Sequence, residues 1–286
     1  MVQAGRPPVR DTPFSVVALW CWYDGRAFHG YQAQQGVRTV QAEVLRAFAE
    51  ARLPRNPVVA GRTDRGVSAR MQVLSAKVLR DEDPGAVAAR LSPFFPRDVG
   101  VVMSRPAPQG FHAAFSATSK TYHYELSGEQ AGDVTLLRRA AACVPGTRDF
   151  LVFHFKTSDR RARRVDAVEV LEHAEGVTLR FVGAQFARYM VRMLTGALAA
   201  VSRGELPLEV LEAGLSSQRP FHCPIAPPEG LTLWSVGYPA AVDPFSADDR
   251  LAVTPVEPGA RAQETSERLV APGGKGDPSP GRTSTR

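Results

Sequence analysis

Residues 61–69 read GRTDRGVSA and place a single carboxylate, that of Asp64, between Arg62 and Arg65. Gly61 and Gly66 permit backbone conformations that are closed to other residues, and they let a ligand approach the main chain closely. The two arginines are expected to lower the pKa of Asp64 by opposite charge and so keep its carboxylate ionised. An ionised carboxylate of this kind can act as a nucleophile.

The sequence of the loop alone allows other roles for the Asp64 carboxylate. Asp64 could cap the loop or pair with an arginine at the surface, which is the commoner role of such residues. A glycoside hydrolase would need a second carboxylate close to the first, and the loop holds none. Because separation along the chain does not fix distance in space, these nine residues do not decide among the three roles.

Strand and helix patterns surround the loop. Residues 14–22 are rich in β-branched and aromatic side chains and run into a turn at residues 23–25. Thr39 fits the N-cap of a helix whose apolar face carries Val40, Val44, Leu45 and Phe48. In residues 74–79 the side-chain character alternates from one position to the next, as it does in a strand. The loop is therefore expected to connect two strands.

The second half of the chain repeats this scheme. Residues 121–126 alternate as a strand, and residues 165–173 and 177–186 read as a hairpin around Glu175 and Gly176. From Ala187 the period becomes helical, with an apolar stripe of Met190, Met193, Leu194, Ala197, Leu198 and Val201. We therefore predict an α+β fold with two α+β halves, residues 14–115 and 116–240, around a cleft.

The two ends of the chain are predicted to lie outside these halves. Residues 1–13 read as a flexible N-terminus. Residues 241–286 hold six prolines, five glycines and one aromatic residue, Phe245, which is too little apolar surface to offset the entropy of ordering. We predict a disordered tail there. This tail carries seven acidic and six basic residues, so its own charge is slightly negative. The positive charge of the chain, formally +6, therefore lies in the folded part.

Composition narrows the class of protein. The positive charge favours a polyanionic partner, because neutralising phosphates releases counterions. The chain has no run of about 18 apolar residues and no apolar signal segment, so we expect a cytoplasmic protein without a membrane partner. The three cysteines form no CxxC pair, and HExxH, Walker-type and GxGxxG motifs are absent. We therefore expect no metal and no cofactor, and side chains must supply the chemistry.

The loop resembles the nucleophile loop of the tRNA pseudouridine synthase A (TruA) family, which typically reads GRTD-x-GVHA. Further segments align in order with that family: YDGRAFHGYQAQ at 23–34, FHAAFSATSKTYHYEL at 111–126, FARYMVRMLTG at 186–196 and PPEGLTLWSVGYP at 227–239. The resemblance spans about residues 14–239. It implies the pseudouridine synthase fold, in which a mainly antiparallel sheet and two α+β halves surround a central basic cleft.

The resemblance also implies roles for particular residues. Asp64 is expected to be the nucleophile, and Tyr122 to stack on the target base and relay a proton. Arg192 is expected to pair with the aspartate, and Arg62 to occupy the space left by the everted nucleotide. Without the family, Tyr122 would read as a core aromatic residue, and Arg192 would lie on a solvated helix face opposite the apolar stripe.

The implied reaction converts uridine in tRNA to pseudouridine, and it consumes no cofactor. A base inside a stem must first be extruded at a cost of a few kcal/mol, which phosphate contacts must offset. Candidate contacts are Arg65, Lys120, Arg188 and the cluster Lys156, Arg160, Arg161, Arg163 and Arg164. An exposed polar loop is the alternative for the cluster. Whether Asp64 attacks the uracil ring or the ribose stays open.

The family resemblance further implies a homodimer that modifies uridines at positions 38 to 40 of the tRNA anticodon arm. This chain departs from the family pattern at Arg65 and Ser68, where alanine and histidine are usual, and it is shorter between Leu126 and Phe150. A non-catalytic RNA-binding or RNA-chaperone module on the same scaffold is the alternative function, and it too would bind RNA in a salt-dependent manner.

Overall fold

The computed structural model describes residues 13–55, 57–154, 161–216 and 221–252, all of which belong to one compact unit. Residues 1–12, Lys156, Arg160 and residues 253–286 lie outside the described residues. None of the helices in the described part is long and apolar enough to cross a membrane.

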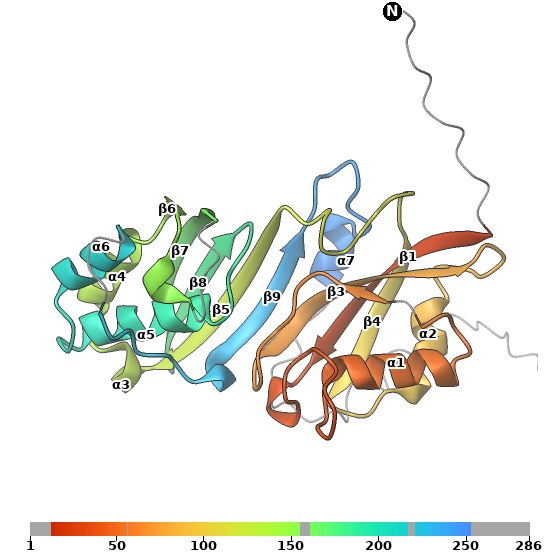
Figure 1. Ribbon diagram of the computed structural model, residues 1–286, viewed down its shortest axis with the longest axis horizontal. Coiled ribbons are helices and arrows are strands. Elements are labelled where there is room, and N and C mark those ends of the chain that lie inside the picture. The colour runs from red at the N-terminus through yellow and green to blue at the C-terminus, as the bar shows by residue number, and fades with distance from the viewer. Residues whose placement is uncertain (1–12, 56, 155–160, 217–220, 253–286) are drawn as a thin grey trace, which may run out of the picture. The chain divides into compact units, whose positions relative to one another are not determined.

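A nine-stranded sheet runs through the described fold in the order β4-β1-β3-β9-β5-β8-β7-β6, with β2 paired to β3 off this path (Figure 1). The strands are β1 Phe14–Tyr23, β2 Val58–Val59, β3 Ser68–Leu79, β4 Val99–Pro106, β5 Ser119–Ser127, β6 Gly146–Arg148, β7 Arg163–His173, β8 Gly176–Gly183 and β9 Leu231–Gly237. Among these strands only β3 and β9 pair in parallel, so the sheet is mainly antiparallel, as the resemblance implies.

The helices fall into two groups along the sheet. Helices α1 (Val40–Glu50) and α2 (Val87–Leu91) accompany β1, β3 and β4 (Figure 1). The second group is α3 (Gly128–Ala131), α4 (Val134–Ala142), α5 (Met190–Ser202) and α6 (Leu208–Leu215). Single 3₁₀ turns are η1 Gly25–Ala27, η2 Ser92–Phe94, η3 Leu151–Phe153 and η4 Pro228–Gly230. The first group falls within residues 14–115 and the second within residues 116–240, and both belong to the same compact unit.

Two local predictions are confirmed. The Thr39 side chain accepts a hydrogen bond from the Ala42 N–H and caps α1, which buries Val44 and Phe48. Strands β7 and β8 form the predicted hairpin, with His173 paired to Gly176 across the turn. Both features follow from residues that are close together in sequence.

Helix α5 differs from its prediction in two respects. It begins at Met190 rather than at Ala187, because Arg188 and Tyr189 form a turn in which Tyr189 has a φ of 62°. Nearly every residue of α5 is buried, not only one apolar stripe, since α3, α4, α6 and η3 all contact this helix. A β-carbon on Gly196 would lie 2.3 Å from the Pro224 carbonyl oxygen, so the segment at Pro224 packs directly on the helix.

Strand β9 joins the two groups of elements. It comes from the end of the described fold, yet it inserts between β3 and β5 at the centre of the sheet (Figure 1). Leu233 pairs with Ala69 of β3 on one side and with Tyr122 of β5 on the other. This register brings the loop before β3 close to Tyr122, although the two are far apart in sequence.

The predicted start of the disordered tail at residue 241 is wrong. Residues 241–252 belong to the described fold and include helix α7 (Ala247–Ala252). Phe245 is buried and meets Trp20 edge to face at 5.8 Å between ring centroids. Asp249 pairs with Arg105 at 2.5 Å, and Arg250 pairs with Asp243 at 2.7 Å. One buried aromatic ring and two ion pairs thus anchor a segment whose composition alone indicates disorder.

Candidate active site

A buried hydrogen-bond network holds the Asp64 loop at its base. The Gln72 side-chain amide donates to the Tyr23 hydroxyl at 3.1 Å and to the Gly61 carbonyl at 2.7 Å. The Tyr23 hydroxyl also lies 2.9 Å from the Thr63 hydroxyl. Tyr23, Thr63 and Gln72 are buried, so these bonds are shielded from water and fix the residue next to Asp64.

The segment 24–31 braces the same loop from another side. The Ser68 hydroxyl accepts a hydrogen bond from the Gly25 N–H at 3.0 Å, and the Thr63 carbonyl accepts one from the Tyr31 N–H at 3.1 Å. A β-carbon on Gly25 would lie 2.2 Å from the Val67 carbonyl group, so only glycine fits there. Ser68, which departs from the family's histidine, therefore serves the packing of the loop.

A cavity of about 780 Å³ opens beside Asp64. It gathers six of the predicted site residues from loop, strand and helix: Arg62, Asp64, Arg65, Tyr122, Arg188 and Arg192. Asp64 is the only carboxylate that lines this cavity in the part of the chain that the structure describes. Without a second carboxylate, the glycoside hydrolase alternative has no support.

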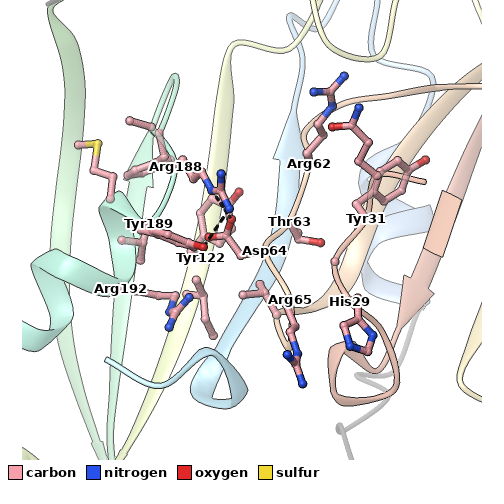
Figure 2. Close-up of a pocket in the computed structure, with 18 of the residues that line it drawn as sticks. His29, Tyr31, Arg62, Thr63, Asp64, Arg65, Tyr122, Arg188, Tyr189 and Arg192 are labelled. Atoms are coloured by element: carbon pink, nitrogen blue, oxygen red, sulfur yellow. Dashed lines mark hydrogen bonds and ion pairs between the residues drawn. The ribbon is translucent and has the colours of Figure 1, made fainter. Parts of the chain in front are cut away.

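The charge partners of Asp64 are not the ones predicted from its sequence neighbours. Figure 2 shows the Asp64 side chain directed toward Arg188 and Tyr189, whereas Arg62 and Arg65 project elsewhere. The Arg188 Nε lies 3.9 Å from Asp64 Oδ1. Consecutive side chains around a turn point in different directions, so adjacency in sequence does not make an ion pair.

The predicted direction of the Asp64 pKa is also wrong. Burial raises the pKa of Asp64 above its ordinary value, and this effect outweighs the charges of Arg192 and Arg188 and the hydrogen bond from the Tyr189 N–H, which lower the pKa. The carboxylate is thus partly desolvated but held beside two cations. Such an environment makes a carboxylate more basic while the cations still favour its ionised form.

Tyr122 faces the cavity as a neutral phenol. Burial raises the pKa of Tyr122 well above its ordinary value, and the charges of Tyr23 and Asp64 raise it further. Its ring meets Phe186 edge to face at 5.3 Å between centroids. Its hydroxyl has no hydrogen-bond partner among the described residues, so it is available to a ligand in the cavity.

Arg188 and Arg192 are placed around the Tyr189 ring. Their guanidinium carbons lie 4.8 and 5.1 Å from its centroid, within cation–π range. Arg192 is also held by its Nε, which donates to the Ala226 carbonyl at 2.8 Å. Arg192 therefore faces the cavity and not bulk solvent, because the segment around Ala226 and the Asp64 loop cover this side of α5.

Other predicted contacts do not line the cavity. Lys120 lies against the loop, where its Cε would be 3.0 Å from a β-carbon on Gly61, and burial lowers the pKa of its ammonium group. Arg161 is exposed and lies outside the cavity lining, as do Arg163 and Arg164.

Several lining residues were not assigned from the sequence, namely His29, Tyr31, Gln34, Phe186 and Tyr189. All of them lie in segments 23–34 and 186–196, which resemble the family. Their individual positions depend on how these segments fold against the loop, so spacing could not single them out.

Comparisons with known proteins identify the family of this chain. A family model described as tRNA pseudouridine synthase matches residues 140–239. A protein named tRNA pseudouridine synthase A from Paraburkholderia phymatum is 36% identical over 78% of this chain and 91% of its own length. Its namesake from Thermococcus kodakarensis is 36% identical over 78% of this chain and 85% of its own length. By these matches, the chain belongs to the tRNA pseudouridine synthase A family.

Proposed function

We propose that this chain converts uridine in tRNA to pseudouridine with Asp64 as the nucleophile. Membership of the family makes the chain an isomerase that acts on RNA, which disfavours the alternative of a non-catalytic RNA-binding module. The observation that carries the proposal is that Asp64 is the sole carboxylate lining the cavity among the described residues, beside Arg188 and near the Tyr122 phenol.

The residues of the cavity can serve each step of this isomerisation. The N1–C1′ bond of uridine breaks, the C5–C1′ bond forms, C5 loses its proton to the medium and N1 gains one, so atoms and charge balance. Asp64 forms and then releases a covalent bond, either to the uracil ring or to the ribose. The neutral Tyr122 hydroxyl can donate or relay a proton.

Arg62 and Arg65 supply cations for the RNA. Both are exposed, and neither has an ion-pair partner within the described residues. They are therefore free to contact phosphates, and Arg62 can occupy the space that an everted nucleotide leaves in the stem.

The test of the nucleophile is Asp64→Asn, with tritium release from C5-labelled uridine in tRNA as the readout. We expect no release from the variant and RNA binding close to that of the wild type. Asp81→Asn, at an exposed carboxylate outside the cavity lining, is the matched control and should release tritium normally. Release by Asp64→Asn at the wild-type rate would refute the assignment.

We further propose that the targets are uridines at positions 38 to 40 of the anticodon arm and that the enzyme works as a cytoplasmic homodimer. The targets and the dimer rest on the family resemblance. Mapping pseudouridine in tRNA from cells with and without the gene tests the targets, and light scattering of the purified protein tests the dimer.

A further inference from the structure

A second cavity of about 480 Å³ adjoins the first. Arg65, Tyr189 and Arg192 line both cavities and form part of their shared wall. The volume lies within the range of about 300–1,000 Å³ that small-molecule sites occupy. Figure 2 shows Arg65 and Arg192 on the same side of Asp64, below it in that view.

The cations of the shared wall are available to a ligand. Arg65 has no hydrogen bond or ion pair within the described residues, and Arg192 uses only its Nε in a hydrogen bond there. By contrast, Arg26, which also lines the second cavity, is paired with Asp24 at 2.6 Å.

A carboxylate lines the second cavity together with these cations. Glu229 is exposed and forms no ion pair in the described part of the chain. Its Oε1 comes within 3.5 Å of where a β-carbon on Gly66 would lie, and the neighbouring Pro228 comes within 2.8 Å. The Glu229 carboxylate thus lies next to the Asp64 loop, where it can accept a hydrogen bond from a ligand and would repel a phosphate.

We propose that the second cavity binds the nucleotide next to the target uridine, an inference that rests on the function proposed above. Consecutive nucleotides share one phosphate, so that phosphate belongs at the shared wall, on Arg65 and Arg192. Glu229 then accepts a hydrogen bond from the 2′-hydroxyl of the neighbouring ribose. This hydroxyl is a donor that every RNA nucleotide carries and DNA lacks, so the contact reads RNA without reading sequence.

The test is a double-mutant cycle on the anticodon stem-loop of a tRNA that the enzyme modifies. One substrate is all RNA, and the others carry a 2′-deoxynucleotide on the 5′ or the 3′ side of the modified uridine. With wild-type enzyme, one of the two deoxy substitutions should lower kcat/KM by about tenfold or more, the scale of a hydrogen bond to a charged group. In Glu229→Ala that penalty should disappear.

Glu209→Ala is the matched control, because Glu209 is exposed on α6, forms no ion pair among the described residues and lines neither cavity. It should keep the full deoxy penalty. The inference would be overturned if the deoxy substitution still lowered kcat/KM in Glu229→Ala. It would also be overturned if kcat/KM depended on the identity of the neighbouring base and not on its ribose. Wild-type enzyme that releases tritium from no RNA would instead refute the proposed function.

The phosphate contact has its own readout. RNA binding is measured in the Asp64→Asn background at several salt concentrations. Arg65→Ala should reduce the slope of the logarithm of the binding constant against the logarithm of the salt concentration by about one, the value for one lost phosphate contact. Arg97→Ala, at an exposed arginine without an ion pair in the described residues, should leave the salt dependence unchanged. If the two variants show equal salt slopes, Arg65 does not contact the shared phosphate.

Discussion

At the scale of single residues, the proposed chemistry depends on the groups that surround Asp64. Burial raises its pKa, whereas Arg192, Arg188 and the Tyr189 N–H act in the opposite direction. The balance gives a carboxylate that is both basic and charge-paired. Arg62 and Arg65, its neighbours in sequence, are exposed and have no ion-pair partner among the described residues.

This balance predicts a pH dependence. If Asp64 must be ionised, activity is present above its pKa and is lost as the pH falls through that value. Arg188→Ala removes one cation that lowers this pKa, so the acid limb of the kcat/KM profile should move to higher pH. Arg97→Ala should not move it. If the acid limb of the kcat/KM profile stayed at the same pH in Arg188→Ala, the titrating group would not be Asp64.

Tyr122→Phe and Tyr23→Phe should have different effects. The Tyr122 hydroxyl has no protein partner among the described residues, so its loss should leave thermal stability unchanged and lower kcat by about 100-fold or more if it moves a proton. The Tyr23 hydroxyl bonds Thr63 and Gln72, so its loss should lower stability by about 1–3 kcal/mol. Equal loss of kcat and RNA affinity in Tyr122→Phe would argue against a role in the transition state.

At the scale of elements, the site is made by packing of turns on the Asp64 loop. η1 meets the loop at Gly25, and the start of α5 meets it at Tyr189. Most of the strands and the cap of α1 were predictable because they follow local periodicity and capping. The close approach at Gly25 was not, since it depends on a segment about 40 residues away in sequence.

Gly25→Ala should therefore damage both the fold and the site. A β-carbon there overlaps the Val67 carbonyl group, and overpacking of this kind costs about 1–3 kcal/mol. Urea denaturation should show that loss, and tritium release should fall with it because the loop must shift. Gly128→Ala, where nothing lies within 4 Å of the added carbon, is the control and should change neither.

At the scale of the whole described fold, β9 and the segment after it, up to residue 252, pack against the first strand and the centre of the sheet. β9 completes the sheet between β3 and β5, and Phe245 packs on Trp20 of β1. The prediction of a tail used the composition of residues 241–286 as a whole, and an average over 46 residues concealed a folded segment at its start.

Phe245→Ala should lower the free energy of unfolding by about 3–5 kcal/mol, as expected for a buried phenylalanine. Phe115→Ala is the control, because Phe115 is 87% exposed, and it should have little effect on stability. Thermal and urea denaturation measure both. No loss in Phe245→Ala would mean that residues 241–252 do not contribute to the fold.

Most strands, the cap of α1 and the loop position of Asp64 were predictable from the chain alone, whereas six of the residues that meet in the cavity were indicated by the family resemblance and the reaction it implies. Periodicity, capping and glycine geometry depend on residues that are close together in sequence, so they can be predicted without the tertiary structure. The charge partners of Asp64, the direction of its pKa, the burial of Phe245 and the place of Glu229 at the second cavity depended on the folded chain. Coulomb forces and desolvation act through space, and the central insertion of β9 determines which distant residues become neighbours.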